Sequence, residues 1–99
     1  IEIGLVKAYL DAAFAELVER KNDTIIVRFE KASLKFFLTQ DYFEAISKTH
    51  LKAKISDNQG KVEITFDVRN KKDYEILEEL KIFGQTFMEI KERKEKKEA

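Results

Sequence analysis

The sequence predicts an α+β domain with its elements in the order α-β-β-α-β-β-α, in which a four-stranded antiparallel sheet has its helices packed on one face. Two observations predict this fold. Apolar residues recur at helical spacing near both ends of the 99-residue chain, and two pairs of alternating apolar and polar segments lie between them. No linker, repeat or low-complexity segment divides the chain, so we expect a single domain over residues 1–99.

The first helix is predicted over residues 2–20. Its apolar residues follow the three-then-four spacing of one helix face, and they are Ile3, Val6, Leu10, Ala13 and Leu17. Asn22 and Asp23 then interrupt the pattern, and residues 24–30 alternate and are rich in β-branched side chains, which is typical of a strand. Residues 34–39 alternate as well. We therefore expect these two segments to pair as a hairpin.

A short helix and a second hairpin are predicted next. Asp41 is followed three residues later by Glu44, which resembles a capping signal and predicts a two-turn helix ending near Lys48. Residues 51–55 and 62–68 alternate on either side of the turn-forming sequence Asp-Asn-Gln-Gly. This pattern predicts two antiparallel strands joined by a tight turn.

A long amphipathic helix is predicted over residues 72–97. Its apolar residues repeat at four-then-three spacing, and they are Ile76, Leu80, Phe83, Phe87 and Ile90. From about residue 91 nearly every side chain is charged, so we expect a helical C-terminal extension that projects into solvent. Gly84 inside this helix costs about 1 kcal/mol relative to alanine, and it indicates either a close approach of another helix or a bend.

Composition and charge exclude several classes of protein. Basic and acidic residues both number 19, so no overall field draws the chain to nucleic acid or to an anionic membrane. The absence of cysteine excludes disulfides, thiol catalysis and thiolate metal sites. No apolar run approaches membrane-spanning length, so we expect a cytoplasmic protein without a membrane partner. Lysine and glutamate are abundant while glutamine and asparagine number three each, a bias reported for hyperthermophile proteins, so we also expect a thermophilic source.

No catalytic or cofactor-binding constellation is visible in the sequence. The chain has one histidine, His50, which we interpret as a partly exposed residue at a helix–strand junction. The three glycines are isolated from one another, which excludes phosphate-binding glycine loops. Glu75, Glu78 and Glu79 share a helix face, but lysines lie within one turn of them, so we interpret them as a solvated ion-pair face. We therefore expect no catalytic residue, no cofactor, no metal and no enzyme activity.

The predicted strand phases place a locally basic surface on the sheet face away from the helices. This candidate interaction surface consists of Ile26, Arg28, Lys35, Phe37, Lys52, Lys54 and Arg69. An open basic sheet with a stacking aromatic side chain is one way of holding single-stranded nucleic acid. Exposed apolar residues on a sheet face, such as Ile26 and Phe37, are instead typical of a surface covered by a second subunit.

Two segments resemble known families in their pattern. An opening helix that contains Leu10-Asp11-Ala12, followed by the predicted order of elements, resembles the LAGLIDADG homing endonucleases. Ala13 stands where that family carries its metal-binding acid, so the resemblance does not imply nuclease activity. The stretch from His50 to Glu92 is similar to the small dimerising subunit of the KEOPS tRNA-modification complex. Neither resemblance assigns the chain to a family.

Our interpretation is a non-enzymatic interaction or assembly module that forms a homo-oligomer, namely a homodimer, or joins a larger complex as a subunit. The alternative is a small protein that binds single-stranded nucleic acid through the basic sheet face. An enzyme of unknown type is the third reading.

Overall fold

The computed structural model describes residues 3–98. Its elements in chain order are α1 (Ile3–Tyr9), a 3-10 turn η1 (Asp11–Ala13), β1 (Ala15–Lys21), β2 (Thr24–Phe29), α2 (Lys31–Phe36), α3 (Thr39–Ser47), β3 (Lys52–Asn58), β4 (Lys61–Asp67) and α4 (Asp73–Glu98). Residue 2, where the predicted first helix begins, lies outside the described residues, as do residues 1 and 99 of the expected domain.

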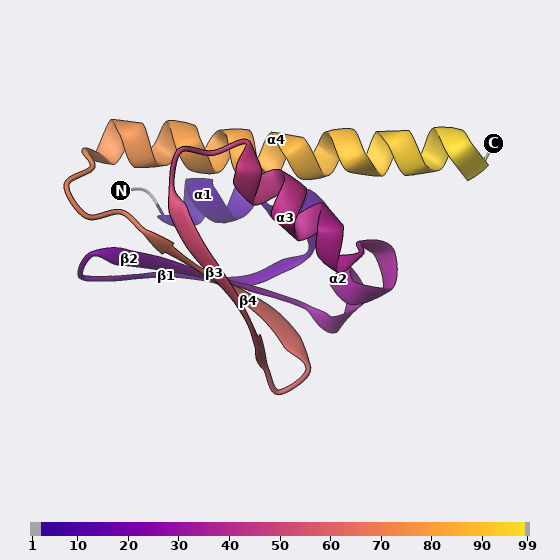
Figure 1. Ribbon diagram of the computed structural model, residues 1–99, viewed down its shortest axis with the longest axis horizontal. Helices are drawn as coiled ribbons and strands as arrows, with labels where there is room; N and C mark the ends of the chain where they lie inside the picture. Colours follow the sequence, from indigo (N-terminus) through magenta and orange to yellow (C-terminus); the bar gives the residue numbers. More distant parts are fainter. Residues whose placement is uncertain (1–2, 99) are drawn as a thin grey trace.

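The four strands form one antiparallel sheet in the order β1-β2-β4-β3, so β1 and β3 are its edges. The helices lie together on one side of this sheet, with α4 running along the length of the molecule (Figure 1). The predicted fold class and order of elements are confirmed. Along β2 and β4 the buried side chains point toward the helices, which leaves the alternate residues on an open face.

The prediction of one helix through residue 20 is wrong in its second half. The helix α1 ends at Tyr9, and Ala15–Lys21 is a strand that pairs with β2. Phe14, at the junction, has a left-handed backbone with φ 62°, which ends the turn η1 and redirects the chain. A bulge between Ala15 and Leu17 shifts the register, so the buried residues Ala15 and Val18 are three apart and imitate helical spacing.

The predicted strand over residues 34–39 is also wrong, because the chain there is helical. Helix α2 covers Lys31–Phe36, and α3 begins at Thr39, two residues before the expected capping residue Asp41. Ser33 and Phe37 are both buried and lie four residues apart, which is the spacing of one helix face. The first hairpin is therefore β1–β2, whereas the predicted β3–β4 hairpin is present, with a tight turn at Gln59 and Gly60.

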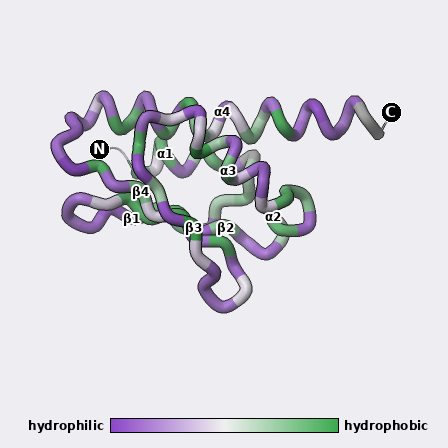
Figure 2. Tube along the Cα trace, in the orientation of Figure 1, coloured by the Kyte–Doolittle hydropathy of each residue, from purple (hydrophilic) through white to green (hydrophobic). Residues whose placement is uncertain are grey.

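The core lies between the inner face of the sheet and the helices. At its centre is an aromatic cluster in which neighbouring ring centroids are 5.0–6.4 Å apart, formed by Phe29, Phe37, Tyr42, Phe66, Phe83 and Phe87. Edge-to-face contacts of this kind stabilise a core beyond the area that they bury. Figure 2 shows that hydrophilic residues occupy the hairpin tips and the last turns of α4.

Candidate functional site

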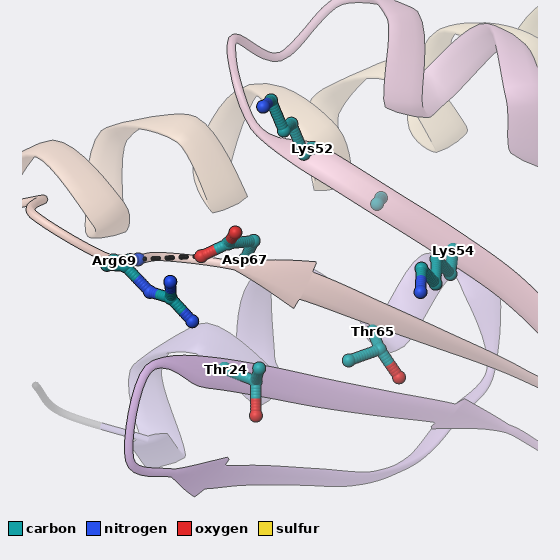
Figure 3. A pocket seen from close by; sticks show the side chains of 7 residues that line it. Thr24, Lys52, Lys54, Thr65, Asp67 and Arg69 are labelled. Atoms are coloured by element: carbon teal, nitrogen blue, oxygen red, sulfur yellow. Dashed lines mark hydrogen bonds between the residues drawn. The ribbon is translucent and has the colours of Figure 1, made fainter.

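The open face of the sheet is hollowed where β2, β4 and β3 lie side by side. Antiparallel pairing places Asp67 of β4 between Thr24 of β2 and Lys52 of β3, and Thr65 opposite Lys54. The hollow has a volume of about 300 Å³. It is lined by Thr24, Lys52, Ala53, Lys54, Thr65, Asp67 and Arg69 (Figure 3).

A second hollow, of about 390 Å³, adjoins the first and reaches the segment that leads into α4. It is lined by His50, Lys52, Asp67, Arg69, Asn70 and Lys71. The two hollows share Lys52, Asp67 and Arg69, so we describe them together as the basic groove. The groove thus brings together residues from both hairpins and from the two loops that flank them.

Positive charge dominates the basic groove. Four of its lining side chains are lysine or arginine, against the single carboxylate of Asp67. That carboxylate accepts a hydrogen bond of 2.9 Å from the backbone N–H of Arg69, which fixes the end of β4. Within residues 3–98, Lys52 and Lys54 form no ion pair, whereas Arg69 lies 3.6 Å from Asp23. The exposed ammonium groups of Lys52 and Lys54 are therefore available to a ligand.

One wall of the groove is fastened to α4 through His50 and Glu79. The backbone N–H of His50 donates to one oxygen of the Glu79 carboxylate, and its ring Nδ1 lies 3.0 Å from the other. Burial raises the pKa of Glu79, but the two hydrogen bonds from His50, together with charge interactions with His50 and Lys71, hold the pKa below its usual value. Glu79 is thus committed to a structural contact, and the His50 ring, whose side chain is 82% exposed, remains at the surface.

The structure separates the residues of the predicted interaction surface. Phe37, expected on the open sheet face, is 1% exposed and packs in the core because its segment is helical. Lys35 is exposed on α2 and is no part of the sheet. Ile26 and Arg28 do lie on the open face, half-buried, outside the basic groove. Only Lys52, Lys54 and Arg69 of the predicted set line the same hollow.

Arg28 is neutralised where it lies. Its guanidinium contacts the Glu63 carboxylate at 3.1 Å, and the Asn58 amide donates to the same carboxylate at 3.0 Å. The hydrogen bond from Asn58 and the charge and hydrogen bond of Arg28 hold the pKa of Glu63 below its usual value, against the effect of partial burial. The charge of Arg28 on the open face is therefore already satisfied by Glu63.

Sequence reasoning missed His50 and Lys71 as members of the groove. The turn at residues 57–60 sets the β3–β4 register, and this register pairs Lys52 with Asp67. The neighbouring positions of Lys52 and Asp67 could therefore have been predicted from the sequence. No local pattern indicates that His50 and Lys71, 21 positions apart in the sequence, line the same hollow.

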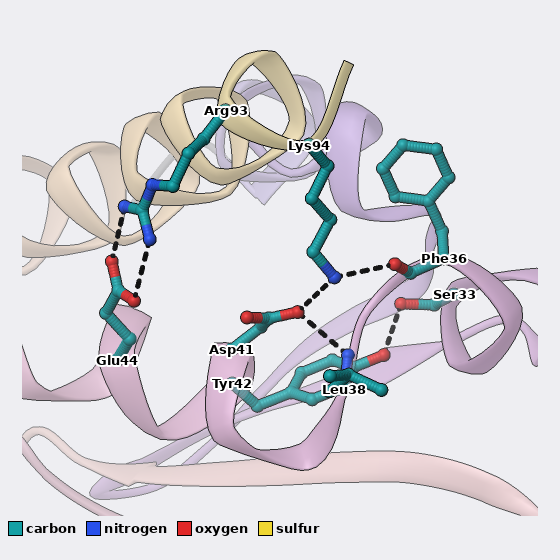
Figure 4. Close-up of polar contacts among 8 residues, drawn as sticks. All are labelled: Ser33, Phe36, Leu38, Asp41, Tyr42, Glu44, Arg93 and Lys94. Atoms are coloured by element: carbon teal, nitrogen blue, oxygen red, sulfur yellow. Dashed lines mark hydrogen bonds and ion pairs between the residues drawn. The ribbon is translucent and has the colours of Figure 1, made fainter. Parts of the chain in front are cut away.

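A second polar cluster joins α4 to the α2–α3 segment (Figure 4). The Lys94 ammonium donates to Asp41 at 2.6 Å and to the carbonyl oxygen of Phe36 at 2.9 Å. The Asp41 carboxylate also accepts from the backbone N–H of Leu38, and Arg93 binds both oxygens of Glu44. These groups satisfy one another, so the cluster acts as a clamp between helices.

A buried hydroxyl pair lies beside this clamp. The hydroxyls of Ser33 and Tyr42 are 2.5 Å apart. Burial raises the pKa of Tyr42, and the hydrogen bond with Ser33 opposes this only in part. Both hydroxyls are enclosed in the core, which leaves neither one open to a substrate.

The part of the chain that the structure describes contains no group of three or more histidine, aspartate or glutamate residues that could hold a metal ion. No helix among the described residues is both long and apolar enough to cross a membrane. The fold and the groove define a small α+β domain whose open sheet face carries a shallow basic hollow.

The comparisons with known proteins give one significant structural match. The chain is similar to the crystal structure of the C-terminal domain of transcription-repair coupling factor, with 59% sequence identity and a TM-score of 0.86. The similarity covers 94% of this chain and 58% of that chain, so this chain spans less than two thirds of the length of the matched chain. No family model matches the sequence, and no curated protein matches it significantly.

Proposed function

We propose that this chain is part of the C-terminal domain of a transcription-repair coupling factor and serves there as a non-catalytic interaction domain. The observation that carries the proposal is the 59% identity to such a domain over 94% of the chain, at a TM-score of 0.86. Proteins of unrelated function can share a fold, so the fold alone would not support this proposal. The sequence identity adds support that a shared fold does not give.

The polar groups of the described residues support a binding role over catalysis. His50 contacts Glu79, and neither Ser33 nor Tyr42 has a base beside it in an open pocket. The two hollows are open to solvent, whereas small-molecule sites typically enclose most of their ligand. An open groove that carries four basic side chains is suited to a macromolecular partner.

The partner that we propose is another part of the coupling factor or a protein that the factor contacts. A homodimer through the sheet face has less support, because Phe37 is buried and Ile26 is the one large apolar residue of the predicted surface that remains on that face. Binding of single-stranded nucleic acid also has less support, because the buried Phe37 ring cannot stack on a base.

The proposal is tested by adding the chain in trans to a related coupling factor from which the C-terminal domain has been removed. We expect the fluorescence anisotropy of the labelled chain to rise to saturation with one chain bound per factor. Sedimentation of the chain alone over a concentration series provides the control, and we expect the mass of a monomer. No binding to the truncated factor, together with a concentration-dependent dimer, would contradict the proposal and favour self-association.

A further inference from the structure

We propose that the basic groove binds an extended, acidic segment of a protein, with carboxylates on alternate residues lying against Lys52 and Lys54. This inference deepens the interaction role proposed above and rests on it. It names the surface that makes the contact and the chemistry of the segment that fits there.

The geometry of β3 suits an extended ligand. This strand is an edge of the sheet, with β4 as its neighbour on one side. Lys52 and Lys54 are two residues apart, so both point to the open face and their Cα atoms are about 6.5–7 Å apart. Side chains on one face of another extended segment have the same repeat. Carboxylates at alternate positions of such a segment therefore match the two ammonium groups.

The distribution of ion pairs distinguishes the groove from the rest of the sheet. Elsewhere the basic side chains have acidic partners: Arg28 contacts Glu63, Lys61 contacts Glu16 and Lys21 contacts Glu19. Lys52 and Lys54 have no such partner within residues 3–98, and Arg69 and Lys71 continue the positive charge toward α4. Among the basic side chains on the four strands, Lys52 and Lys54 are thus the ones without an acidic partner in the described residues, since Arg20 also contacts Asp73.

The groove fits a protein segment better than single-stranded nucleic acid. No phenylalanine, tyrosine or tryptophan lines either hollow, which leaves the His50 ring as the aromatic group there, and stacking of bases on several aromatic rings is a principal source of affinity for single strands. The Thr65 hydroxyl can donate to a carboxylate or carbonyl oxygen of the segment, and the Asp67 carboxylate can accept from its backbone N–H groups. Lysines on an edge strand discourage pairing with strands in general, whereas an acidic strand forms favourable cross-strand pairs with them.

The test uses the full chain and fluorescently labelled peptides of about eight residues, slightly longer than a typical strand. One peptide alternates glutamate with threonine, a second has glutamine in place of glutamate, and a single-stranded oligonucleotide of equal charge is the third probe. The variant Lys52→Glu/Lys54→Glu reverses the charge of the groove. The matched control Lys35→Glu/Lys96→Glu makes the same change in net charge at exposed helix positions outside it.

At low ionic strength we expect the glutamate peptide to bind and the glutamine peptide not to bind. Reversal of Lys52 and Lys54 should weaken binding of the glutamate peptide about tenfold or more, and the control should bind within about twofold of the parent chain. Equal weakening in both variants, preferential binding of the oligonucleotide, or no binding of the glutamate peptide would overturn the proposal.

The same variants separate this inference from the proposed function. The truncated coupling factor is titrated with each variant in turn. If the factor binds the parent chain and the Lys52→Glu/Lys54→Glu variant equally, the interaction role stands and the groove is not its contact surface. If the factor binds neither chain while the glutamate peptide binds the groove, the proposed function fails and the site remains.

Discussion

A Cβ atom added to Gly84 would lie 2.3 Å from the carbonyl oxygen of Tyr9. Helix α4 continues through Gly84 without a break, so this glycine marks a close approach of two helices and not a bend. The backbone of α1 occupies the space that a side chain would need. The contact explains why the least favourable non-proline residue for a helix interior stands in the middle of the longest helix.

Gly84→Ala should destabilise the protein even though alanine favours a helix by about 1 kcal/mol over glycine. Displacement of the Tyr9 backbone should cost more than this gain, so we expect the free energy of unfolding to fall by about 1–2 kcal/mol. Urea denaturation provides the measurement. Gln85→Ala, at the exposed neighbouring position, is the control and should change stability by less than about 0.5 kcal/mol. A Gly84→Ala variant as stable as the parent would show that the helices can separate freely.

Lys94→Met should destabilise the clamp between α4 and α3. The Asp41 side chain is only 7% exposed and would lose its ammonium partner, so we expect a loss of about 2–3 kcal/mol in the free energy of unfolding. Lys96→Met, which removes an exposed charge from the same helix, should have little effect. Adding Asp41→Asn to Lys94→Met should recover part of the loss, and a further fall in stability would contradict this account.

The Ser33–Tyr42 hydroxyl pair should behave as one unit. Ser33→Ala or Tyr42→Phe alone leaves one buried hydroxyl without a partner and should cost about 1–2 kcal/mol. The double variant should cost less than the sum of the two single variants, with a coupling energy of about 1 kcal/mol. Thermal and urea unfolding of all four proteins measure the cycle. Strict additivity would mean that the two hydroxyls do not interact.

Glu63 should contribute to the acid sensitivity of the fold. Its pKa in the folded protein is below the ordinary value of 4.5, so its contribution to stability is fully present above pH 4.5 and is lost as the pH falls through the folded pKa. Glu63→Gln should therefore be less stable than the parent at neutral pH, and the difference should shrink on acidification. Glu95→Gln, at an exposed position, makes the same change in net charge and is the control.

The fold class follows from the two hairpin-like patterns and the amphipathic ends of the chain, but the first hairpin was displaced along the sequence. The bulge at the start of β1 gives Ala15 and Val18 a helical spacing. The left-handed backbone at Phe14 could not be predicted, because a bulky aromatic residue rarely adopts that conformation. Conversely, residues 34–39 alternate like a strand, but the buried residues of this segment, Ser33 and Phe37, are four apart, as on one face of a helix. Short apolar patterns allow both periods, and tertiary packing decides between them.

The site was predictable only where local register determines it. The exposed positions of Lys52 and Lys54 follow from alternation along β3, and their pairing with β4 follows from the tight turn at Gly60. Phe37 was wrongly placed in the candidate interaction surface because residues 34–39 were predicted as a strand, whereas the segment is helical and Phe37 is buried. The inclusion of Lys71 and His50 depends on how the loops close against α4, which the sequence pattern of neither loop encodes.

Helix α4 has 26 residues, and at 1.5 Å per residue it is about 39 Å long, close to the 43 Å longest dimension of the molecule. One end begins beside Lys71 of the basic groove, the other is held through Lys94, and the Tyr9–Gly84 contact lies between them. One helix therefore links the groove, α1 and the α2–α3 segment, and its buried side chains from Ile76 to Ile90 fasten it to the core between these contacts.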